Sequence, residues 1–390
     1  MNYKRTVRAC FVGYIVQAVI NNLAPLLFLT FQSQYGIPLS KITLLITINF
    51  CLQLTIDCAS VYFIDRIGYR ASALLAHFFS AFGLIMLSAL PRVLPDPYVG
   101  LLCAVCFYAV GGGLLEVIIS PMVEACPTEN KARTMSILHS FYCWGSAAVI
   151  VLSTLFLKVF GAASWQILAP LWAILPIANG IVFLKTPIAP LIAEGEEGLK
   201  PRALLSSRTF WLLAVLMVCA GACEHGVSEW ASSFAEKGLG ISKVMGDLAG
   251  PTIFALMMGT SRAIYGRLLH RFRLRTMMLF SGALCAVAYL TVGLIPNPVA
   301  GLLGMALCGF AVGVMWPGTF SIAAAKIRNG GTAMFALLAL AGDLGCASGP
   351  TLAGMVAGMA NDSLRIGILS SGIFPIVLIV GLLLLGREKA

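Results

Sequence analysis

Long apolar stretches recur along the whole chain and are separated by short polar connectors. Each is close to the roughly 20 residues that a helix needs to cross a hydrocarbon layer about 30 Å thick. The alternation over about ten residues that is typical of β-barrel strands is absent from the sequence, so helices must satisfy this much backbone in lipid. We therefore predict an all-α membrane protein with twelve transmembrane helices. The predicted spans are 7–31, 40–63, 70–90, 98–123, 134–158, 163–185, 208–235, 245–270, 274–294, 298–325, 331–358 and 364–386.

The composition favours a membrane protein over a soluble domain. Hydrophobic residues make up 59% of the chain and charged residues 11%, and the mean hydropathy is +0.93. Most of the 12 cysteines are scattered singly through apolar segments, which is typical of packing residues rather than of a disulfide scaffold. The sequence lacks a cluster of histidines and cysteines with metal-ligand spacing, a nucleophile paired with its base and a phosphate loop. We therefore expect no enzyme activity, no cofactor and no bound metal.

The positive charges predict one orientation in the membrane. With the N-terminus in the cytoplasm, 19 of the 26 lysines and arginines fall on the cytoplasmic side and six on the other side. We therefore expect both termini in the cytoplasm and the chain in a plasma membrane, such as the bacterial inner membrane. Basic loops that face the anionic inner leaflet account for the net charge of +10. We therefore interpret the basic run His270–Arg275 as a topology anchor rather than a nucleic-acid contact.

The chain reads as two halves with related sequences. A polar connector containing EGEEG separates the first six predicted spans from the last six. A shift of 205 residues lays DRIGYR (Asp65–Arg70) onto HRFRLR (His270–Arg275), and both join the second and third helices of their half. We predict two parallel six-helix pseudo-repeats. Their expected bounds are 1–185 and 208–390, with a cytoplasmic linker at 186–207.

Glu116 is the only charged residue between Tyr98 and Val123, in the stretch GGGLLEVIISP. An ionisable side chain in the hydrocarbon region costs at least about 2.5 kcal/mol on insertion scales, so such a residue normally faces protein or water and has a function. Gly112, Glu116 and Ser120 recur every four residues, which places them on one helix face. We expect this face to line a cavity and Glu116 to bind a proton.

Two further acidic residues are candidate proton sites. Asn49, Gln53 and Asp57 form a similar stripe on the second helix, and Asp57 lies at about the depth of Glu116, roughly 12 Å from the cytoplasmic end. The 205-residue shift maps Asp57 onto Arg262, and an inter-helix ion pair or latch is an equal alternative for both. Asp343 lies about 18 Å into the eleventh helix and is the second candidate proton site.

Polar and aromatic residues within the spans are candidate solute ligands. Amide side chains can bond hydroxyl groups, and an indole ring offers a flat apolar face to a sugar. The alternative for each tryptophan is packing or an interfacial anchor, and a lone histidine on a helix is more often a packed polar residue. The candidates are Gln17, Asn21, Asn22, Asn49, Gln53, Ser120, His139, Trp144, Glu224, His225, Ser228, Trp230 and Trp316.

Several motifs resemble those of a known family. The loop VYFIDRIGYR is similar to the signature of the major facilitator superfamily. GGGLLEVIISPM and TMSILHSFYCWGSA resemble the fourth and fifth helices of the fucose:proton symporter family. SRAIYGRLLHRF resembles its eighth helix through Arg262 and Arg271, and GVMWPGTFSIAAAKI resembles its tenth helix. Ser120 replaces the asparagine usual in that family, and INNLAPLL lacks the acidic residue that its sugar symporters carry there.

The resemblance implies a secondary transporter of a small polar solute, a sugar or sugar-like compound, with Glu116 as its proton-linked carboxylate. Alternating access would couple the proton to the solute. The expected partners are the solute, protons and the lipid bilayer, with no nucleic acid and the chain as a monomer. The alternatives are a proton-driven exporter of drugs or metabolites and a non-transporting membrane receptor. We assign the cytoplasmic gate to Asp65, Arg66, Arg70, Arg133, Arg262 and Arg271.

Overall fold

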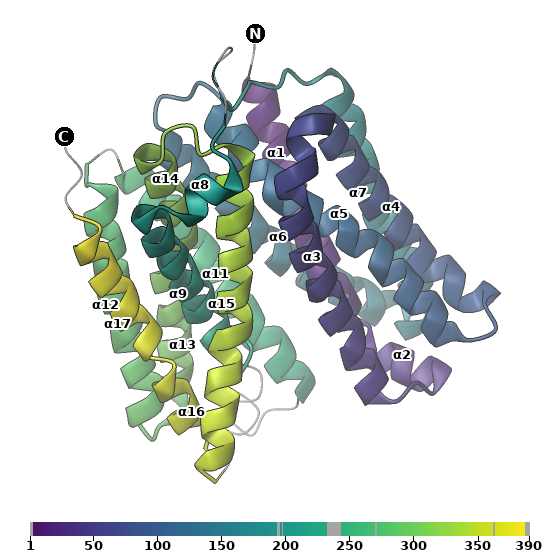
Figure 1. Cartoon of the computed structure of the whole chain (residues 1–390). Helices are drawn as coiled ribbons and strands as arrows, with labels where there is room; N and C mark the ends of the chain where they lie inside the picture. The colour runs from purple at the N-terminus through teal and green to yellow at the C-terminus, as the bar shows by residue number, and fades with distance from the viewer. Residues whose placement is uncertain are drawn as a thin grey trace. The chain divides into compact units, whose positions relative to one another are not determined.

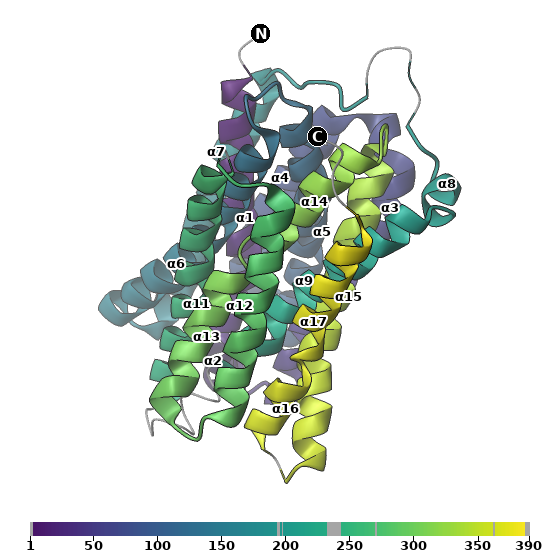
Figure 2. The same cartoon turned by 90° about the vertical axis from the view of Figure 1, so that its left-hand side faces the viewer.

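The computed structural model describes residues 3–192, 196, 198–231, 243–269, 271–361 and 363–386. Within these ranges the secondary structure is helical, and no strand occurs. The chain divides into two units (Figures 1 and 2). Unit 1 comprises residues 1–127 and 144–196, and unit 2 comprises residues 128–143 and 197–390. The prediction of an all-α membrane protein is confirmed.

Unit 1 is built from long helices whose ends follow from local sequence. Pro25 ends the first helix one residue later, because proline cannot continue the hydrogen-bond ladder, and a short helix resumes after Leu27. Asp96 accepts a hydrogen bond from the backbone of Tyr98 and so caps the helix that Pro97 begins. The helices are α1 Lys4–Leu26, α2 Phe28–Tyr35, α3 Leu39–Ile67, α4 Tyr69–Val93, α5 Pro97–Ala125, the second part of α6 Lys131–Phe160, the 3₁₀ turn η1 Ala162–Ser164 and α7 Trp165–Lys185.

Unit 2 contains the first part of α6 and the remaining helices of the described chain. Two predicted spans are kinked here, one between α13 and α14 and the other between α16 and α17. The predicted span 208–235 extends beyond Ser228, where α9 ends, and residues 232–242 lie outside the described part. The helices are α8 Pro201–Leu205, α9 Arg208–Ser228, α11 Lys243–Leu268, α12 Leu274–Leu294, α13 Pro298–Val312, α14 Met315–Lys326, α15 Gly331–Met359, α16 Leu364–Ser370 and α17 Ile373–Leu384.

Eleven helical stretches of the described chain are long and apolar enough to cross a membrane. They match eleven of the twelve predicted spans. The other predicted span, 245–270, is occupied by α11, a helix of 26 residues that carries the buried Arg262. The hydrophobic pattern therefore predicted the helices well.

Glycines allow neighbouring helices to approach closely in both units. In α4 and α5, a Cβ atom on Gly83 would collide with the backbone of Tyr108, and one on Gly111 with Ser80. In α9 and α15, a Cβ atom on Gly345 would collide with the carbonyl of Val218. Small residues serve this purpose in membrane helices because lipid supplies no hydrophobic driving force between helices.

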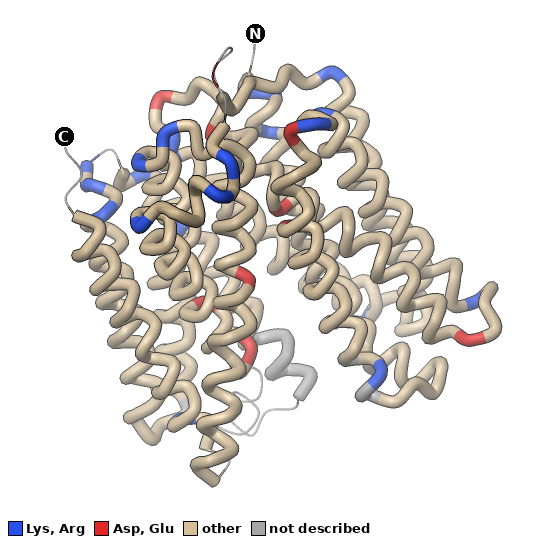
Figure 3. The backbone as a smooth tube through the Cα atoms, viewed as in Figure 1, with Lys and Arg blue, Asp and Glu red and all other residues tan. Residues whose placement is uncertain are grey.

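Basic residues gather at helix ends. In unit 2 most lysines and arginines lie at the end of the bundle that holds α8 and the last turn of α17 (Figure 3). An arginine near such an end can also cap another helix. Arg70 at the start of α4 donates to the carbonyls of Phe183 and Leu184, which end α7, at 2.8 and 2.7 Å. Cations at a helix C-terminus complement its dipole and its unpaired carbonyls.

Candidate functional site

Glu116 lies in a layer of polar side chains in unit 1. Its carboxylate accepts a hydrogen bond from the side-chain amide of Gln17 on α1 at 2.9 Å. Gln17 is buried and Glu116 is half-buried. One turn further along α5, Ser120 shares a hydrogen bond of 2.8 Å with the hydroxyl of Tyr14. The face of α5 that carries Glu116 and Ser120 therefore meets a polar face of α1.

A second set of amides connects α1 with α3. Asn21 accepts hydrogen bonds from Gln53 at 2.9 Å and from Asn49 at 3.5 Å. A Cβ atom on Gly112 would lie 3.4 Å from the amide of Gln53, so the small-residue face of α5 adjoins this set as well. Asp57, the next residue of the predicted stripe, is fully buried one turn beyond Gln53. The structure thus brings together two stripes that the sequence predicted separately.

Two other candidate ligands of unit 1 lie beside this layer. Asn22 donates to the hydroxyl of Ser146 on α6 at 3.1 Å and to the carbonyl of Ala18 at 2.8 Å. Trp144 also lies on α6 and is 37% exposed, so a packing role in the core does not account for it. Sequence reasoning missed Tyr14, although Tyr14, Gln17 and Asn21 have the spacing of one helix face.

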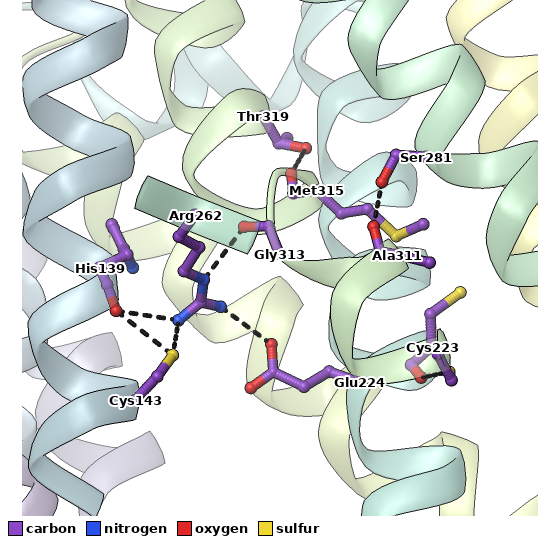
Figure 4. A network of polar contacts seen from close by, with 11 residues as sticks. His139, Cys143, Cys223, Glu224, Arg262, Ser281, Ala311, Gly313, Met315 and Thr319 are labelled. Carbon is purple, nitrogen blue, oxygen red and sulfur yellow. Dashed lines mark hydrogen bonds and ion pairs between the residues drawn. The ribbon is translucent and has the colours of Figure 1, made fainter. Parts of the chain in front are cut away.

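Arg262 on α11 is the centre of a buried network in unit 2 (Figure 4). Its guanidinium forms an ion pair of 3.2 Å with Glu224 on α9. It also donates to the carbonyl of His139 at 3.0 Å and to the sulfur of Cys143 at 2.8 Å, both on α6. The backbone carbonyl of Arg262 in turn accepts a hydrogen bond of 2.7 Å from Ser136. Arg262, which we predicted to belong to a gate or an ion pair, is therefore buried and connects α11 with α6 and α9.

The network also supports the kink between α13 and α14. The carbonyl of Gly313 would normally accept a hydrogen bond from the residue four positions later, but that residue is Pro317, which has no N–H. Arg262 donates to this carbonyl through Nε at 3.0 Å. Ser281 on α12 donates to the nearby carbonyl of Ala311. Side chains therefore satisfy carbonyls at the kink, as the membrane interior requires.

The remaining candidate ligands of unit 2 lie on α9, in the turn that follows it and on α14. His225 contacts the carboxylate of Glu229 at 3.2 Å through Nδ1, and Ser228 is half-buried on the same helix. Trp230 donates to the carbonyl of Pro350 at 3.3 Å. Trp316 is 9% exposed, and its ring lies against Gly342. The next residue in the sequence, Asp343, is half-buried.

The charged residues assigned to the gate separate into two groups. Asp65, Arg66, Arg70, Arg133 and Arg271 are exposed at or near helix ends. Arg262 differs from them, because its side chain is buried within unit 2.

Comparison with solved structures identifies the fold. The Escherichia coli fucose:proton symporter FucP has a TM-score of 0.84 and 15% identity, and the match covers 100% of both chains. The proton:xylose symporter XylE has a TM-score of 0.77 and 12% identity, over 97% of this chain and 94% of that one. The human organic anion transporter MFSD10 has a TM-score of 0.74 and 17% identity, over 99% of this chain and 100% of that one. At these identities the likeness shows the fold alone.

Comparison with curated proteins finds no match to the sequence. Comparison with family profiles agrees with the fold. The family profile described as Major Facilitator Superfamily matches residues 9–350, which is most of the chain. The resemblance of the loop VYFIDRIGYR to the superfamily signature is thereby confirmed, and the chain belongs to the Major Facilitator Superfamily.

Proposed function

We propose that this superfamily member is a secondary active transporter that moves a small polar solute, a sugar or sugar-like compound, together with protons by alternating access. The hydrogen bond of 2.9 Å between Gln17 and Glu116 carries the proposal, because it places an ionisable group within a layer of amides. A proton on Glu116 would change the charge of this layer and, with it, the relative free energies of the two facing states. The halves 1–185 and 208–390, joined by 186–207, would be the moving parts.

The amides suit a solute with hydroxyl groups. Each amide side chain can donate and accept hydrogen bonds, and a sugar hydroxyl can do the same. A bound sugar can therefore replace one amide as the hydrogen-bond partner of another without leaving a buried polar atom unsatisfied. FucP and XylE, whose names describe proton symport of fucose and xylose, have the same fold. The proposed ligands are Gln17, Asn21, Asn22, Asn49, Gln53, Ser120, His139, Trp144, Glu224, His225, Ser228, Trp230 and Trp316.

Glu116 is the proposed proton site, with Asp57 and Asp343 as the next candidates. In the proposed cycle Glu116 carries a proton when the solute is bound. Losing the proton toward the cytoplasm leaves a carboxylate beside the amide of Gln17, which then bonds the carboxylate instead of the solute. Solute affinity falls, and the carrier is reset.

Uptake into proteoliposomes with an imposed pH gradient tests this function. A panel of neutral sugars, sugar acids and other organic anions would be compared for the wild type and Glu116→Gln. We expect gradient-driven accumulation in the wild type and exchange without accumulation in the variant. Glu124→Gln is the matched control, because it removes a carboxylate from the same helix two turns away. Full accumulation by Glu116→Gln would contradict the coupling role of Glu116. Asp57→Asn and Asp343→Asn would then be tested in the same assay.

Export is the second candidate function, and an aromatic cluster in unit 2 favours it. The ring of Phe320 lies 6.4 Å from Trp316, 5.3 Å from Phe335 and 6.1 Å from His139, measured between centroids. Such a cluster suits an aromatic or amphipathic compound. Loss of a dye from loaded liposomes that is driven by an inward proton gradient, without uptake of any sugar, would support export.

The orientation and the gate are part of the same proposal. Both termini would face the cytoplasm of a cell with the chain, as a monomer, in its plasma membrane. Labelling of single cysteines introduced at each terminus of a cysteine-free variant checks the orientation. The proposed cytoplasmic gate is formed by Asp65, Arg66, Arg70, Arg133, Arg262 and Arg271.

A further inference from the structure

We infer that Arg262 is a positioning residue of unit 2. Its guanidinium donates to the Gly313 carbonyl the hydrogen bond that Pro317 cannot donate, and the charge state of Glu224 determines how firmly the guanidinium is held in place. The kink between α13 and α14 would then respond to protons. This device is separate from the proton site proposed at Glu116 in unit 1, and neither depends on the other.

The first step concerns the backbone at the kink. The helical ladder resumes with the hydrogen bond from the amide of Gly318 to the carbonyl of Val314 at 2.8 Å. The preceding carbonyl, of Gly313, is left over because Pro317 has no N–H. An unpaired carbonyl is costly in a membrane interior, and Arg262 Nε lies 3.0 Å from it. Unit 1 contains a similar contact. The hydroxyl of Ser88 donates at 2.6 Å to the carbonyl of Gln166, which lies four residues before Pro170 and so has no N–H donor there.

The second step concerns what holds the guanidinium. Among the described residues its N–H groups donate to the carbonyl of Gly313 at the kink, to the carbonyl of His139 and the sulfur of Cys143 on α6, and to the carboxylate of Glu224 on α9. The two carbonyls cannot be protonated at ordinary pH, and the thiol is already protonated. Among these four acceptors, the Glu224 carboxylate is the one that a proton can neutralise. Arginine itself stays charged, so the pair can change only through the acid.

The third step is the consequence of that proton. With Glu224 ionised, the ion pair fixes one side of the guanidinium and the Nε–H points at Gly313. Once Glu224 is protonated, the pair is lost and a buried cation has no compensating charge from Glu224, which favours conformations in which Arg262 moves. Movement of Arg262 leaves the Gly313 carbonyl unpaired, so the kink loosens.

Other titratable groups surround the pair and define the controls. His139 and Cys143 interact electrostatically with Arg262 from α6. Cys308 on α13 and Cys346 on α15 interact with Glu224, and Cys346 also interacts with Asp343 and with His225 on α9. His225 contacts Glu229 on its own helix, so Glu229 is a neighbouring carboxylate that bonds a different partner.

A double-mutant cycle tests the bond to Gly313. Amide hydrogen exchange of peptides covering 309–320 would be measured on the full chain in nanodiscs for the wild type, Arg262→Gln, Pro317→Ala and the double variant. Alanine at 317 restores the missing N–H. We expect Arg262→Gln to raise exchange at the kink about tenfold in the wild type and less than about threefold in the Pro317→Ala background. Equal effects in both backgrounds would overturn the inference.

The role of Glu224 is tested by the pH dependence of the same exchange, corrected for the intrinsic rate and followed from neutral pH to the lowest pH at which the protein stays folded in the nanodisc. We expect faster exchange of the wild type at acid pH and a flat, fast profile for Glu224→Gln. Glu229→Gln should keep the wild-type profile. A flat wild-type profile, or a profile of Glu224→Gln that still follows pH, would overturn the proton dependence. If Arg262→Gln fails to fold, Arg262→Lys replaces it, since lysine keeps the charge but lacks the planar fork. Because no solute is involved, these results are independent of transport.

Discussion

Arg70 and Arg275 make the same contact in the two units of the chain. Arg70 donates to the last two carbonyls before the final residue of α7, those of Phe183 and Leu184. Arg275 donates to the carbonyls of Leu382 and Leu383, at the end of α17, at 3.0 and 3.4 Å. The two arginines lie 205 residues apart, which is the shift that aligns the loops DRIGYR and HRFRLR. The sequence repeat is therefore also a repeat of contacts.

This relationship predicts matched losses of stability. Arg70→Gln and Arg275→Gln should each lower the free energy of unfolding by about 1 kcal/mol, because each removes hydrogen bonds to carbonyls at a helix end. Arg66→Gln and Arg273→Gln are the controls, since they remove a charge from the same loops. Thermal unfolding of the purified protein in nanodiscs measures all four. Equal losses in the variants and their controls would mean that charge, rather than the helix-end contact, sets the stability.

The hydroxyl pair of Tyr14 and Ser120 predicts a non-additive effect. Tyr14→Phe and Ser120→Ala each leave the partner hydroxyl in a buried site, which should cost about 1 to 3 kcal/mol. The double variant removes both polar atoms, so its loss should be smaller than the sum of the single losses. Unfolding midpoints of the three variants give the comparison. Strict additivity would show that the two hydroxyls do not depend on each other.

Much of the fold could be predicted from hydrophobic periodicity, and the exceptions have local causes. The spans follow from the length of apolar runs, which is a property of neighbouring residues. The division of the first span at Leu27 follows from Pro25 and could have been predicted. The kink at Gly313 was harder to predict, because Pro317 shows that a donor is missing but not which residue replaces it.

The candidate site was predicted as stripes, and its connections required the structure. Helical spacing places Gly112 and Glu116 on one face, but it does not reveal that Gln17 meets the carboxylate. The same limit applies to Arg262, whose partner Glu224 is 38 residues away and whose other partners lie on α6. Contacts between distant segments depend on helix packing, which periodicity leaves undetermined.

Close helix packing predicts opposite effects of adding a methyl group at two glycines of α15. Gly345→Ala should destabilise the protein by about 1 to 3 kcal/mol, because its Cβ atom would collide with the backbone of α9. Gly358→Ala should be neutral or stabilising by up to about 1 kcal/mol, since nothing lies within 4 Å of its added Cβ atom. Thermal unfolding distinguishes the two. A large loss for Gly358→Ala would contradict this packing of the helix.

The amide of Gln17 predicts a shift in the pH dependence of transport, given the proposed proton site. Gln17→Leu removes a donor that favours the ionised form of Glu116, so the carboxyl should keep its proton to higher pH. The pH of half-maximal uptake should therefore be higher for Gln17→Leu than for the wild type. Gln53→Leu is the matched control, because Gln53 lies in the same layer but bonds Asn21. It should raise KM for the solute and leave the pH midpoint unchanged. The same shift in both variants would mean that the layer as a whole, rather than the bond from Gln17, sets the proton affinity.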